Sequence, residues 1–270
     1  MRVLLTGITG NLGGEVASDL VKRGFEVVPL IRTQKKEIID ELQRNFKEIV
    51  CGDLIGDEAI QWSGRVDCIV HCAGIVQFAS AEHSNERMMK KIIGFAIQKK
   101  VPIYYISTAF VYRPDEGTNE LHNAYEDDKW CAEQLLIGSG IPYGIFRPSI
   151  LVGNSRTGYY SVIRSFLSAI RNATIQGEKL RFPKLFGNAN MVTVDQVAHS
   201  IGNGIEEKKL AIAFVCNPNP PSSQWVVSKG LECFGVSDDI EFIDCPFEEF
   251  ETYNLTEIEK KLYQFEKHYY

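Results

Sequence analysis

The sequence predicts an α/β fold in which a doubly wound parallel sheet is followed by a small C-terminal lobe. Two observations predict it. Short, continuously apolar runs alternate with helical patterns through the first half of the chain, and this alternation becomes irregular after Gly153. Continuous apolar runs are typical of strands that are buried on both faces of a parallel sheet. Right-handed crossovers between such strands place helices on both faces.

Six apolar runs are the predicted strands of this sheet, at residues 2–6, 26–31, 48–51, 66–72, 103–107 and 143–147. Helices are expected between them. Leu12, Val16 and Leu20 recur at four-residue spacing, and Gly24 then provides a helix stop. Residues 84–99 and 124–137 have the same helical pattern.

The last part of the chain predicts a different mixture of elements. We expect helices at residues 159–173 and 196–206, a strand at 210–216, and a helix–strand–helix segment after the turn-rich stretch 217–222. Asp195 is a candidate N-cap for the helix at 196–206, and Thr256 is a candidate N-cap for the final helix. The sequence contains no internal repeat or low-complexity linker, so a single domain over residues 1–270 is expected.

The composition favours a globular protein and argues against several other classes. Hydrophobic residues make up 44% and charged residues 24% of the 270 residues, and the net charge is −6. This acidic balance provides no basic footprint for nucleic acid or for an anionic membrane surface. No apolar run reaches the roughly 18 residues of a spanning helix, and Met1 leads directly into the first predicted strand. A cytoplasmic location is therefore expected.

The seven cysteines are scattered along the chain. An odd number without a regular framework predicts reduced thiols. Cys68, His71 and Cys72 could suggest a metal site, but a strand would separate Cys68 from Cys72 by ~13 Å, too far to share one ion. We therefore expect buried thiols and no metal, and we interpret His71 as a hydrogen-bonded structural histidine.

Gly7, Gly10 and Gly13 form the motif behind the first functional prediction. They follow a predicted strand and open the next helix, which is the context that such a glycine pattern needs. Gly7 permits a tight turn, Gly10 lets the main chain approach a phosphate, and Gly13 allows close packing of helix and strand. The helix N-terminus offers free N–H groups to the pyrophosphate of a dinucleotide. The residues expected to bind it are Gly7, Thr9, Gly10, Asn11, Leu12 and Gly13.

The end of the second predicted strand bears on which dinucleotide binds. An NAD site usually has an acidic residue there, which accepts a hydrogen bond from the ribose 2′-hydroxyl. Here the strand is followed by Arg32, Lys35 and Lys36 instead. A guanidinium suits a 2′-phosphate through its charge and its fork of donors, although the three cations could also be a solvated loop. We predict NADP(H), with Arg32 as its main determinant, and keep NAD(H) as the alternative.

Further candidate cofactor-binding residues follow the later strands. Asp53 could accept a hydrogen bond from the adenine amino group, or it could serve as a turn or helix cap. Small residues after the fourth strand would let a cofactor lie against the edge of the sheet. These candidates are Asp53, Leu54, Cys72, Ala73, Gly74, Ser107, Pro148, Ser149 and Ile150.

Thr108, Tyr125 and Lys129 are the predicted catalytic residues. Tyr125 and Lys129 are spaced to share one helical face, and Thr108 follows Ser107 at the end of an apolar run. A free phenol has a pKa of ~10, too high for efficient proton transfer near neutrality, and a nearby ammonium favours the phenolate. Lys129 would also hold the nicotinamide ribose, so Tyr125 and Lys129 count as cofactor-binding as well. Thr108 would share the negative charge that develops on a substrate oxygen.

Together these motifs resemble an extended short-chain dehydrogenase/reductase over nearly the whole chain. Several segments resemble, more narrowly, the thioester reductase or fatty acyl-CoA reductase-like branch with its male sterility-type NAD-binding domain. These segments are residues 6–13, 105–111, 125–136, 146–153 with 157–158, and 191–198. The resemblance implies a Rossmann-like sheet, NADPH as hydride donor, and Thr108, Tyr125 and Lys129 as the catalytic set. The chain departs from the branch at Asn11, where an aromatic is common, and at Asp128, where a serine usually precedes the lysine.

We therefore expect an NADPH-dependent oxidoreductase that reduces a carbonyl, with reduction of an acyl thioester to an aldehyde as the narrower hypothesis. The expected partners are a small-molecule substrate and an acyl carrier protein, and the chain would be a monomer or a homodimer. Residues 1–150 would mainly bind the dinucleotide, and residues 151–270 would mainly form the substrate-binding lobe. The alternative is an NAD-dependent nucleotide-sugar epimerase or dehydratase, which uses the same trio. A non-catalytic dinucleotide-binding regulator is a third hypothesis.

Overall fold

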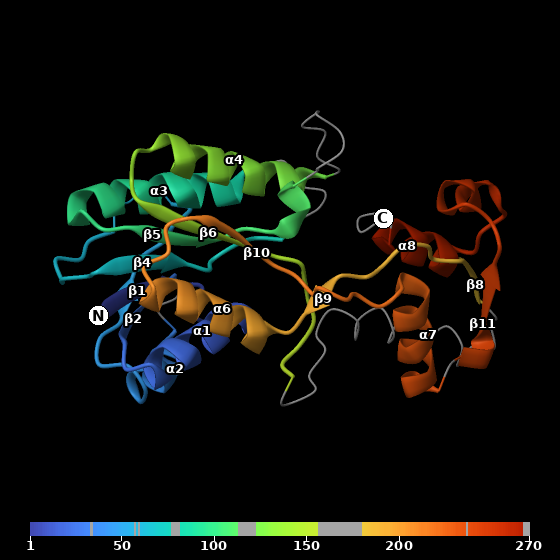
Figure 1. The fold of residues 1–270 in the computed structure, drawn as a ribbon, viewed down its shortest axis with the longest axis horizontal. Coiled ribbons are helices and arrows are strands. Elements are labelled where there is room, and N and C mark those ends of the chain that lie inside the picture. Colours follow the sequence, from blue (N-terminus) through green and yellow to red (C-terminus); the bar gives the residue numbers. More distant parts are fainter. Residues whose placement is uncertain are drawn as a thin grey trace. The chain divides into compact units, whose positions relative to one another are not determined.

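The structure, a computed structural model, describes residues 1–32, 35–56, 58, 60–76, 82–112, 123–155, 180–235 and 237–266 (Figure 1). The chain forms two compact units. The first consists of Met1–Ser149 and Val194–Cys216, and the second of Ile150–Thr193 and Asn217–Tyr270. The chain therefore leaves the first unit after Ser149 and returns to it at Val194, with one helix and one strand. The expected division of function between residues 1–150 and 151–270 stays a prediction.

The described strands of the first unit form one parallel sheet in the order β10-β6-β5-β4-β1-β2-β3. The strands are β1 (Arg2–Thr6), β2 (Glu26–Ile31), β3 (Val50–Cys51), β4 (Cys68–His71), β5 (Ile103–Ile106), β6 (Tyr143–Pro148) and β10 (Ile212–Val215). Strand order runs outward from β1 in both directions, to β2 on one side and to β4 on the other. Ligands of open α/β sheets bind at such a switch point, outside the carboxyl ends of the strands.

Helices cover both faces of this sheet. They are α1 (Asn11–Lys22), α2 (Lys36–Gln43), α3 (Ser84–Lys99), α4 (Ala124–Gly138) and α6 (Val194–Glu206), with a short 3-10 helix η1 (Ala109–Val111) after β5. Helix α3 packs against α4 on one face, and α1 packs against α6 on the other (Figure 1). The doubly wound parallel α/β fold is therefore confirmed.

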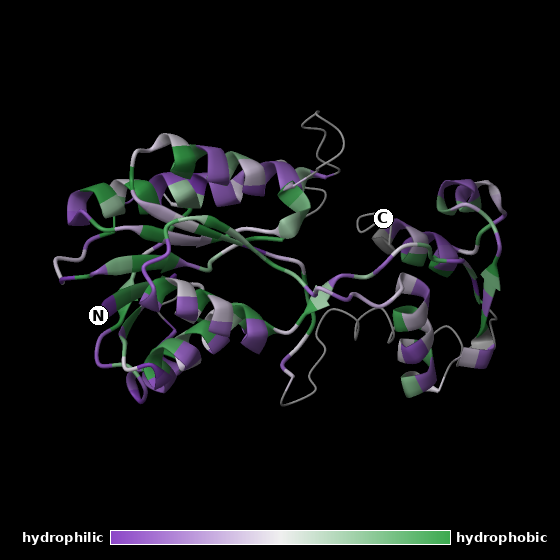
Figure 2. Ribbon diagram, in the orientation of Figure 1, coloured by the Kyte–Doolittle hydropathy of each residue, from purple (hydrophilic) through white to green (hydrophobic). Residues whose placement is uncertain are grey.

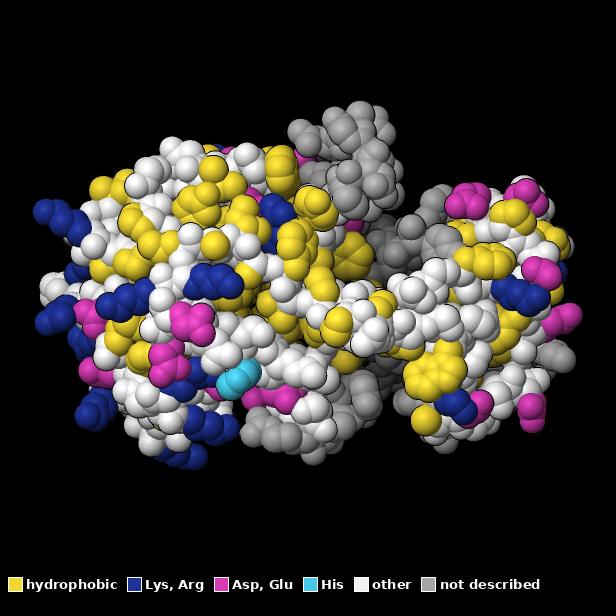
Figure 3. Space-filling model, viewed as in Figure 1, with side chains coloured by type: hydrophobic (Ala, Val, Ile, Leu, Met, Phe, Trp, Pro, Cys, Tyr) yellow, Lys and Arg dark blue, Asp and Glu magenta, His cyan; other side chains and the backbone are white. Residues whose placement is uncertain are grey.

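Burial explains why these segments form these elements. Val3, Leu4 and Leu5 of β1 are fully buried, as expected for a strand covered on both faces. Helix α1 buries Val16 and Leu20 on one side only. Figure 2 shows the same contrast, with hydrophobic residues dominating the strands and hydrophilic residues interspersed on the helices. On the face of the first unit seen in Figure 3, basic and acidic side chains are intermixed.

The second unit has a core of its own. Its strands pair as β7 (Ile150–Leu151) with β9 (Met191–Val192) and as β8 (Leu180–Pro183) with β11 (Ile240–Ile243), and its helices are α7 (Ser223–Phe234), η2 (Ser237–Asp239), η3 (Phe247–Thr252) and α8 (Glu257–Glu266). Phe182, Leu231, Phe250 and Tyr263 are among its buried residues.

Two predicted helix caps have different outcomes. Thr256 caps α8 as predicted, because its Oγ1 accepts a hydrogen bond from the N–H of Glu259 and Glu259 accepts one in return from the N–H of Thr256. Asp195 is not the N-cap of α6, since that helix already begins at Val194. Asp195 lies in the first turn, where its charge suits the positive end of the helix dipole.

The predicted bounds of β1, β2 and α3 agree with the structure, and β3, β4 and β5 are shorter than predicted. Helix α2 lies between two predicted strands, where a helix was expected but given no bounds, and strands β7, β8 and β9 were not predicted. The helix expected at 159–173 lies outside the described residues. Among the residues that the structure describes, no helix combines the length and apolarity that a bilayer crossing would require.

Candidate active site

The turn between β1 and α1 requires two of its glycines. Gly7 has a φ of +77°, and a Cβ atom on it would lie 2.5 Å from the backbone nitrogen of Ala73. A Cβ atom on Gly13 would lie 2.0 Å from the carbonyl oxygen of Gly7. The N–H of Gly10 closes the turn with a 2.9 Å hydrogen bond to Gly7. The absence of side chains therefore lets β1, the first turn of α1 and the segment after β4 pack backbone to backbone.

A cavity of about 260 Å³ opens at the switch point, next to this turn. Its walls come from the ends of β1, β2 and β4 and from the segment after β3. The predicted cofactor-binding residues that line it are Gly7, Thr9, Gly10, Arg32, Asp53, Leu54, Cys72, Ala73 and Gly74. Unpredicted lining residues include Thr6, Ile75 and Met88. The described part of the chain thus gathers residues from five separate segments, Met88 of α3 being the fifth, around one space beside a helix N-terminus.

Two lining residues show their local roles. Asp53 forms a turn, in which its Oδ1 accepts a 3.0 Å hydrogen bond from the N–H of Ile55. This matches the structural role that we considered for Asp53, and the adenine contact stays a prediction. Arg32 is exposed at the end of β2 and faces the cavity. Its guanidinium is therefore open to a ligand.

Thr6 lines the cavity and contacts His71, and both residues are fully buried. The Thr6 hydroxyl accepts a 3.0 Å hydrogen bond from the N–H of Ala73 and lies 2.7 Å from Nδ1 of His71. Burial lowers the pKa of His71 to about 3, so the imidazole is neutral at physiological pH. The structural role predicted for His71 is confirmed. The sequence contained a signal for Thr6, a hydroxyl at the end of an otherwise apolar strand, but its partner lies 65 positions away.

Lys129 brings a buried ammonium to the edge of this cavity. It is 5% exposed, and its Nζ donates a 2.8 Å hydrogen bond to the carbonyl oxygen of Ile106 at the end of β5. A Cβ atom on Gly74 would lie 3.3 Å from Nζ. Burial lowers the pKa of Lys129 to about 8, although the charge of Asp128 opposes this shift. The ammonium therefore flanks the cavity wall at Gly74.

Thr108 and Tyr125 lie at the same end of the sheet. Thr108 follows β5 and is 5% exposed. It is the N-cap of η1, and its hydroxyl accepts a 3.3 Å hydrogen bond from the N–H of Phe110. Helix η1 packs against α4, which carries Tyr125 and Lys129 one turn apart. Tyr125 is half-buried and interacts electrostatically with Tyr105 of β5. The pKa of Tyr105 is raised first by burial and second by Tyr125. The structure therefore brings the predicted trio to the carboxyl edge of β5.

The other predicted cofactor-binding residues are not among those that line the cavity. Asn11, Leu12 and Gly13 form the first turn of α1, Ser107 follows β5, Pro148 ends β6 and Ser149 follows it, and Ile150 begins β7 in the second unit. Among the described residues, the buried Ser107 hydroxyl has no hydrogen-bond partner.

Asn85 is a polar residue of this site that sequence analysis missed. It is 1% exposed near the start of α3, and its side-chain amide pairs with the backbone of Ile75. Its Oδ1 accepts from the Ile75 N–H at 3.0 Å, and its Nδ2 donates to the Ile75 carbonyl at 2.9 Å. Asn85 therefore holds one wall of the cavity in place.

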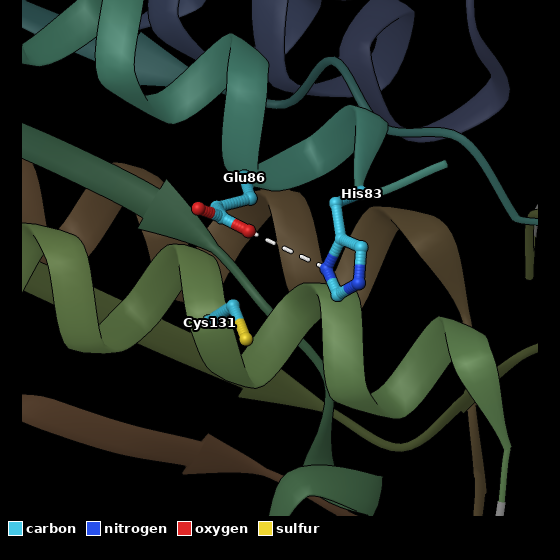
Figure 4. A group of neighbouring side chains, drawn as sticks. All are labelled: His83, Glu86 and Cys131. Carbon is cyan, nitrogen blue, oxygen red and sulfur yellow. Dashed lines mark ion pairs between the residues drawn. The ribbon is translucent and has the colours of Figure 1, made fainter. Parts of the chain in front are cut away.

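His83, Glu86 and Cys131 form a separate polar group between α3 and α4 (Figure 4). Their potential ligand atoms lie within 4.8 Å of one another. His83 Nδ1 is 3.4 Å from Glu86, which also pairs with Lys90 at 2.5 Å. Burial raises the pKa of the Cys131 thiol, and the positive end of the α3 dipole disfavours a cation. These ion pairs account for the group, and we assign no metal to it.

Comparison with known proteins finds a relative that is similar in sequence and several structures that are similar in fold. Glycine betaine reductase ATRR of Emericella nidulans is 27% identical over 248 residues, which cover 74% of this chain. The chain spans only 19% of the length of that protein.

The terminal R domain from the myxalamid PKS-NRPS pathway has a TM-score of 0.77 at 20% identity, with 98% of this chain and 78% of that one covered. An archaeal thiolation-reductase di-domain has a TM-score of 0.67 at 21% identity, with 96% and 79% covered. UDP-N-acetylglucosamine 4-epimerase from Bacillus cereus has a TM-score of 0.64 at 16% identity, with 100% and 96% covered. At these identities the structures support the fold alone.

A protein-family model shows which family the chain belongs to. The model described as Male sterility protein matches residues 5–201, which is more than half of the chain and includes the glycine turn and the trio. The chain therefore belongs to the Male sterility protein family, an NAD(P)-binding family of reductases of the extended short-chain dehydrogenase/reductase type.

Proposed function

We propose that this chain reduces a carbonyl with NADPH, and that its substrate is an acyl thioester, which it converts to an aldehyde. One observation carries the proposal: a buried ammonium, Lys129, flanks the dinucleotide cavity at Gly74, with Tyr125 one helical turn away. Thr108 lies at the end of the strand that Lys129 contacts. A hydroxyl, a phenol and an ammonium next to a dinucleotide site are the groups that carbonyl reduction requires.

The cavity suits a nicotinamide dinucleotide at several points. Its pyrophosphate would lie over the N-terminus of α1, where Gly7 and Gly10 leave the main chain uncovered. Arg32 would bind the 2′-phosphate, because no acidic side chain stands at the end of β2 to bind a ribose hydroxyl instead. Lys129 would bind the nicotinamide ribose. When bound, this cofactor supplies a hydride.

The protein groups would handle charge and the proton. As hydride adds to the thioester carbon, the carbonyl oxygen becomes negative and is stabilised by the hydroxyls of Thr108 and Tyr125. Tyr125 gives its proton to this oxygen, and the Lys129 ammonium stabilises the phenolate that remains. The carbon–sulfur bond then breaks as the oxygen returns its proton through Tyr125 to the departing sulfur. One hydride and one proton are consumed overall, and an aldehyde and a thiol are produced.

The thioester is proposed to be carried either by coenzyme A or by a thiolation domain. The likeness to a thiolation-reductase di-domain and to a terminal R domain supports a carrier-bound acyl group. Both forms present the same phosphopantetheine thioester. The carrier, the substrate and the choice of NADPH are all parts of this proposal.

A panel of substrates tests it. NADPH oxidation would be followed with acyl-CoAs of different chain lengths, acyl-loaded carrier protein, free aldehydes and nucleotide sugars, and the aldehyde product would be trapped as a hydrazone. We expect NADPH-dependent release of thiol and aldehyde in equal amounts from at least one thioester. Oxidation of NADPH with free aldehydes alone would restrict the function to simple carbonyl reduction and contradict the thioester proposal.

A nucleotide-sugar epimerase is the second candidate, because a 4-epimerase structure covers the whole of this chain. Such enzymes recycle a tightly held NAD, and Arg32 in place of an acidic residue argues against that. Denaturing the purified protein and identifying the released nucleotide separates the two candidates. Stoichiometric NAD together with turnover of a nucleotide sugar would favour the epimerase.

A further inference from the structure

Asp128 lies on α4, the helix that carries Tyr125 and Lys129, and its side chain hydrogen-bonds to the start of α3. It is 7% exposed and accepts three hydrogen bonds of 2.8 Å each. The backbone N–H and the side-chain amide of Asn85 donate to one carboxylate oxygen, and the backbone N–H of Glu86 donates to the other. All three partners are donors, so they match an ionised carboxylate. Two of them are free N–H groups of the first turn of a helix.

These bonds also fix the orientation of the Asn85 amide. Because Nδ2 faces Asp128, Oδ1 is directed to the N–H of Ile75. Ile75 and Gly74 both line the dinucleotide cavity. A Cβ atom on Gly74 would be 3.3 Å from Oδ1 of Asn85 and 3.3 Å from Nζ of Lys129. Two sets of contacts therefore reach the same stretch of backbone. One runs from Asp128 through Asn85 to Ile75, and the other is the close approach of Lys129 to Gly74.

We propose that Asp128 is a positioning residue of this site. Through Asn85, it fixes the position of the Gly74–Ile75 wall relative to Lys129. The inference rests on the proposed function, in which Lys129, next to this wall, binds the nicotinamide ribose.

The charge of Asp128 has a second consequence at Lys129. Burial lowers the pKa of Lys129, and the largest opposing contribution comes from Asp128, followed by Cys72 and Glu133. Tyr105 of β5 also faces the ammonium, which lies 4.7 Å from the centroid of its ring. His71, behind it on β4, is neutral. Removing the Asp128 charge would therefore lower the Lys129 pKa further, and Lys129 would lose its proton at a lower pH.

The test compares Asp128→Asn with Asp127→Asn. Both remove one negative charge from the first turns of α4, but the Asp127 side chain is 49% exposed and is not among the groups that act on Lys129. The affinity for NADPH would be measured by fluorescence titration between about pH 6.5 and 9.5. We expect Asp128→Asn to weaken binding roughly tenfold and to move the loss of affinity on the alkaline side to lower pH. Asp127→Asn should change affinity less than about twofold, with no displacement of the pH profile.

A double-mutant cycle separates positioning from general loss of structure. Asn85→Ala should also weaken NADPH binding, and adding Asp128→Asn to it should weaken binding by much less than it does in the wild type. If Asp128→Asn does not fold, as judged by circular dichroism and thermal unfolding, the same titrations would be made with Asp128→Ser, which keeps one acceptor.

Equal affinities and pH profiles for the Asp128 and Asp127 variants, or fully additive effects with Asn85→Ala, would overturn the inference. These measurements need no substrate. Their outcome is therefore separate from that of the thioester panel, which tests the proposed function in the wild-type chain.

Discussion

The dinucleotide site of the first unit has a buried end and an exposed end, and the two are built differently. At the buried end, Lys129 and Thr108 are each 5% exposed and hydrogen-bond to the protein before any ligand arrives. At the other end, Arg32 is exposed. Preorganised groups in a low dielectric interact strongly, whereas exposed charges are screened by water and salt. The chemistry should therefore depend on the buried end, and the choice of dinucleotide should depend on the exposed end.

The largest effect is expected from removing the phenolic hydroxyl at the buried end. Tyr125→Phe should lower kcat by roughly 10²–10⁴-fold, because a positioned proton donor contributes about that much. The affinity for NADPH should stay within about threefold, since the ring remains. Steady-state kinetics with a confirmed substrate and a fluorescence titration measure the two effects.

Tyr143→Phe is the matched control for this change, because Tyr143 starts β6 at the opposite end of the sheet. It should keep nearly full turnover. Equal turnover of Tyr125→Phe and Tyr143→Phe would remove Tyr125 from the mechanism and revive the hypothesis of a non-catalytic dinucleotide-binding protein.

A large effect on stability is expected at the glycine turn, which joins the two ends. Gly13→Ala would place a Cβ atom 2.0 Å from the carbonyl oxygen of Gly7, and we expect it to reduce the free energy of unfolding by about 3 kcal/mol and to abolish tight NADPH binding. Gly14→Ala, one position later in the same helix, would meet only Ile8 at 3.5 Å. It should be neutral or stabilise by up to about 1 kcal/mol. Urea unfolding of both variants decides the matter, and equal stabilities would contradict the close packing.

A smaller effect per pH unit is expected at the buried His71. Burial lowers the pKa of His71 to about 3, so between pH 6.5 and about 3 the unfolded chain binds a proton that the folded chain does not. Stability should therefore fall with decreasing pH in that window, by at most about 1.4 kcal/mol per pH unit from this residue. His71→Gln should flatten this dependence in urea unfolding at several pH values. A slope for His71→Gln equal to that of the wild type would contradict the burial of a neutral imidazole.

The smallest effect is expected at the exposed end. Arg32→Ala should reduce the ratio of NADPH to NADH efficiency by about tenfold, with little change in kcat, because it removes one charge-assisted contact to a 2′-phosphate. The two values of kcat/KM measure this directly. An unchanged ratio would mean that Arg32 belongs to a solvated loop, and the preference for NADPH would then need another source.

The sequence was sufficient to predict the elements whose pattern is local. β1 and β2 were predicted at their observed bounds because fully buried strands appear as continuous apolar runs. The bounds of helix α2 were not predicted, since it has eight residues and none of them is buried. Strands β7 and β9 have two residues each, which is too short for any periodicity to be recognised. The bounds of long, buried elements could therefore be predicted from the sequence, and those of short or exposed elements could not.

The same distinction applies to the site. Glycine spacing, and a tyrosine four positions before a lysine, are local patterns with a known chemistry, so Gly7, Tyr125 and Lys129 could be named in advance. Asn85 and Asp128 were not predicted to act together, because they lie 43 positions apart and meet only when α3 packs on α4. Residues that position others thus become visible only in the fold.

The central claim is that hydride passes to a thioester carbonyl with Tyr125 as proton donor. The most direct test uses the best thioester of the panel with NADPH deuterated at C4 on either face, followed by mass spectrometry of the trapped aldehyde. We predict one deuterium in the aldehyde from one of the two faces, and an amount reduced to about a hundredth or less in Tyr125→Phe. An aldehyde without deuterium, or the same yield from Tyr125→Phe, would contradict the account.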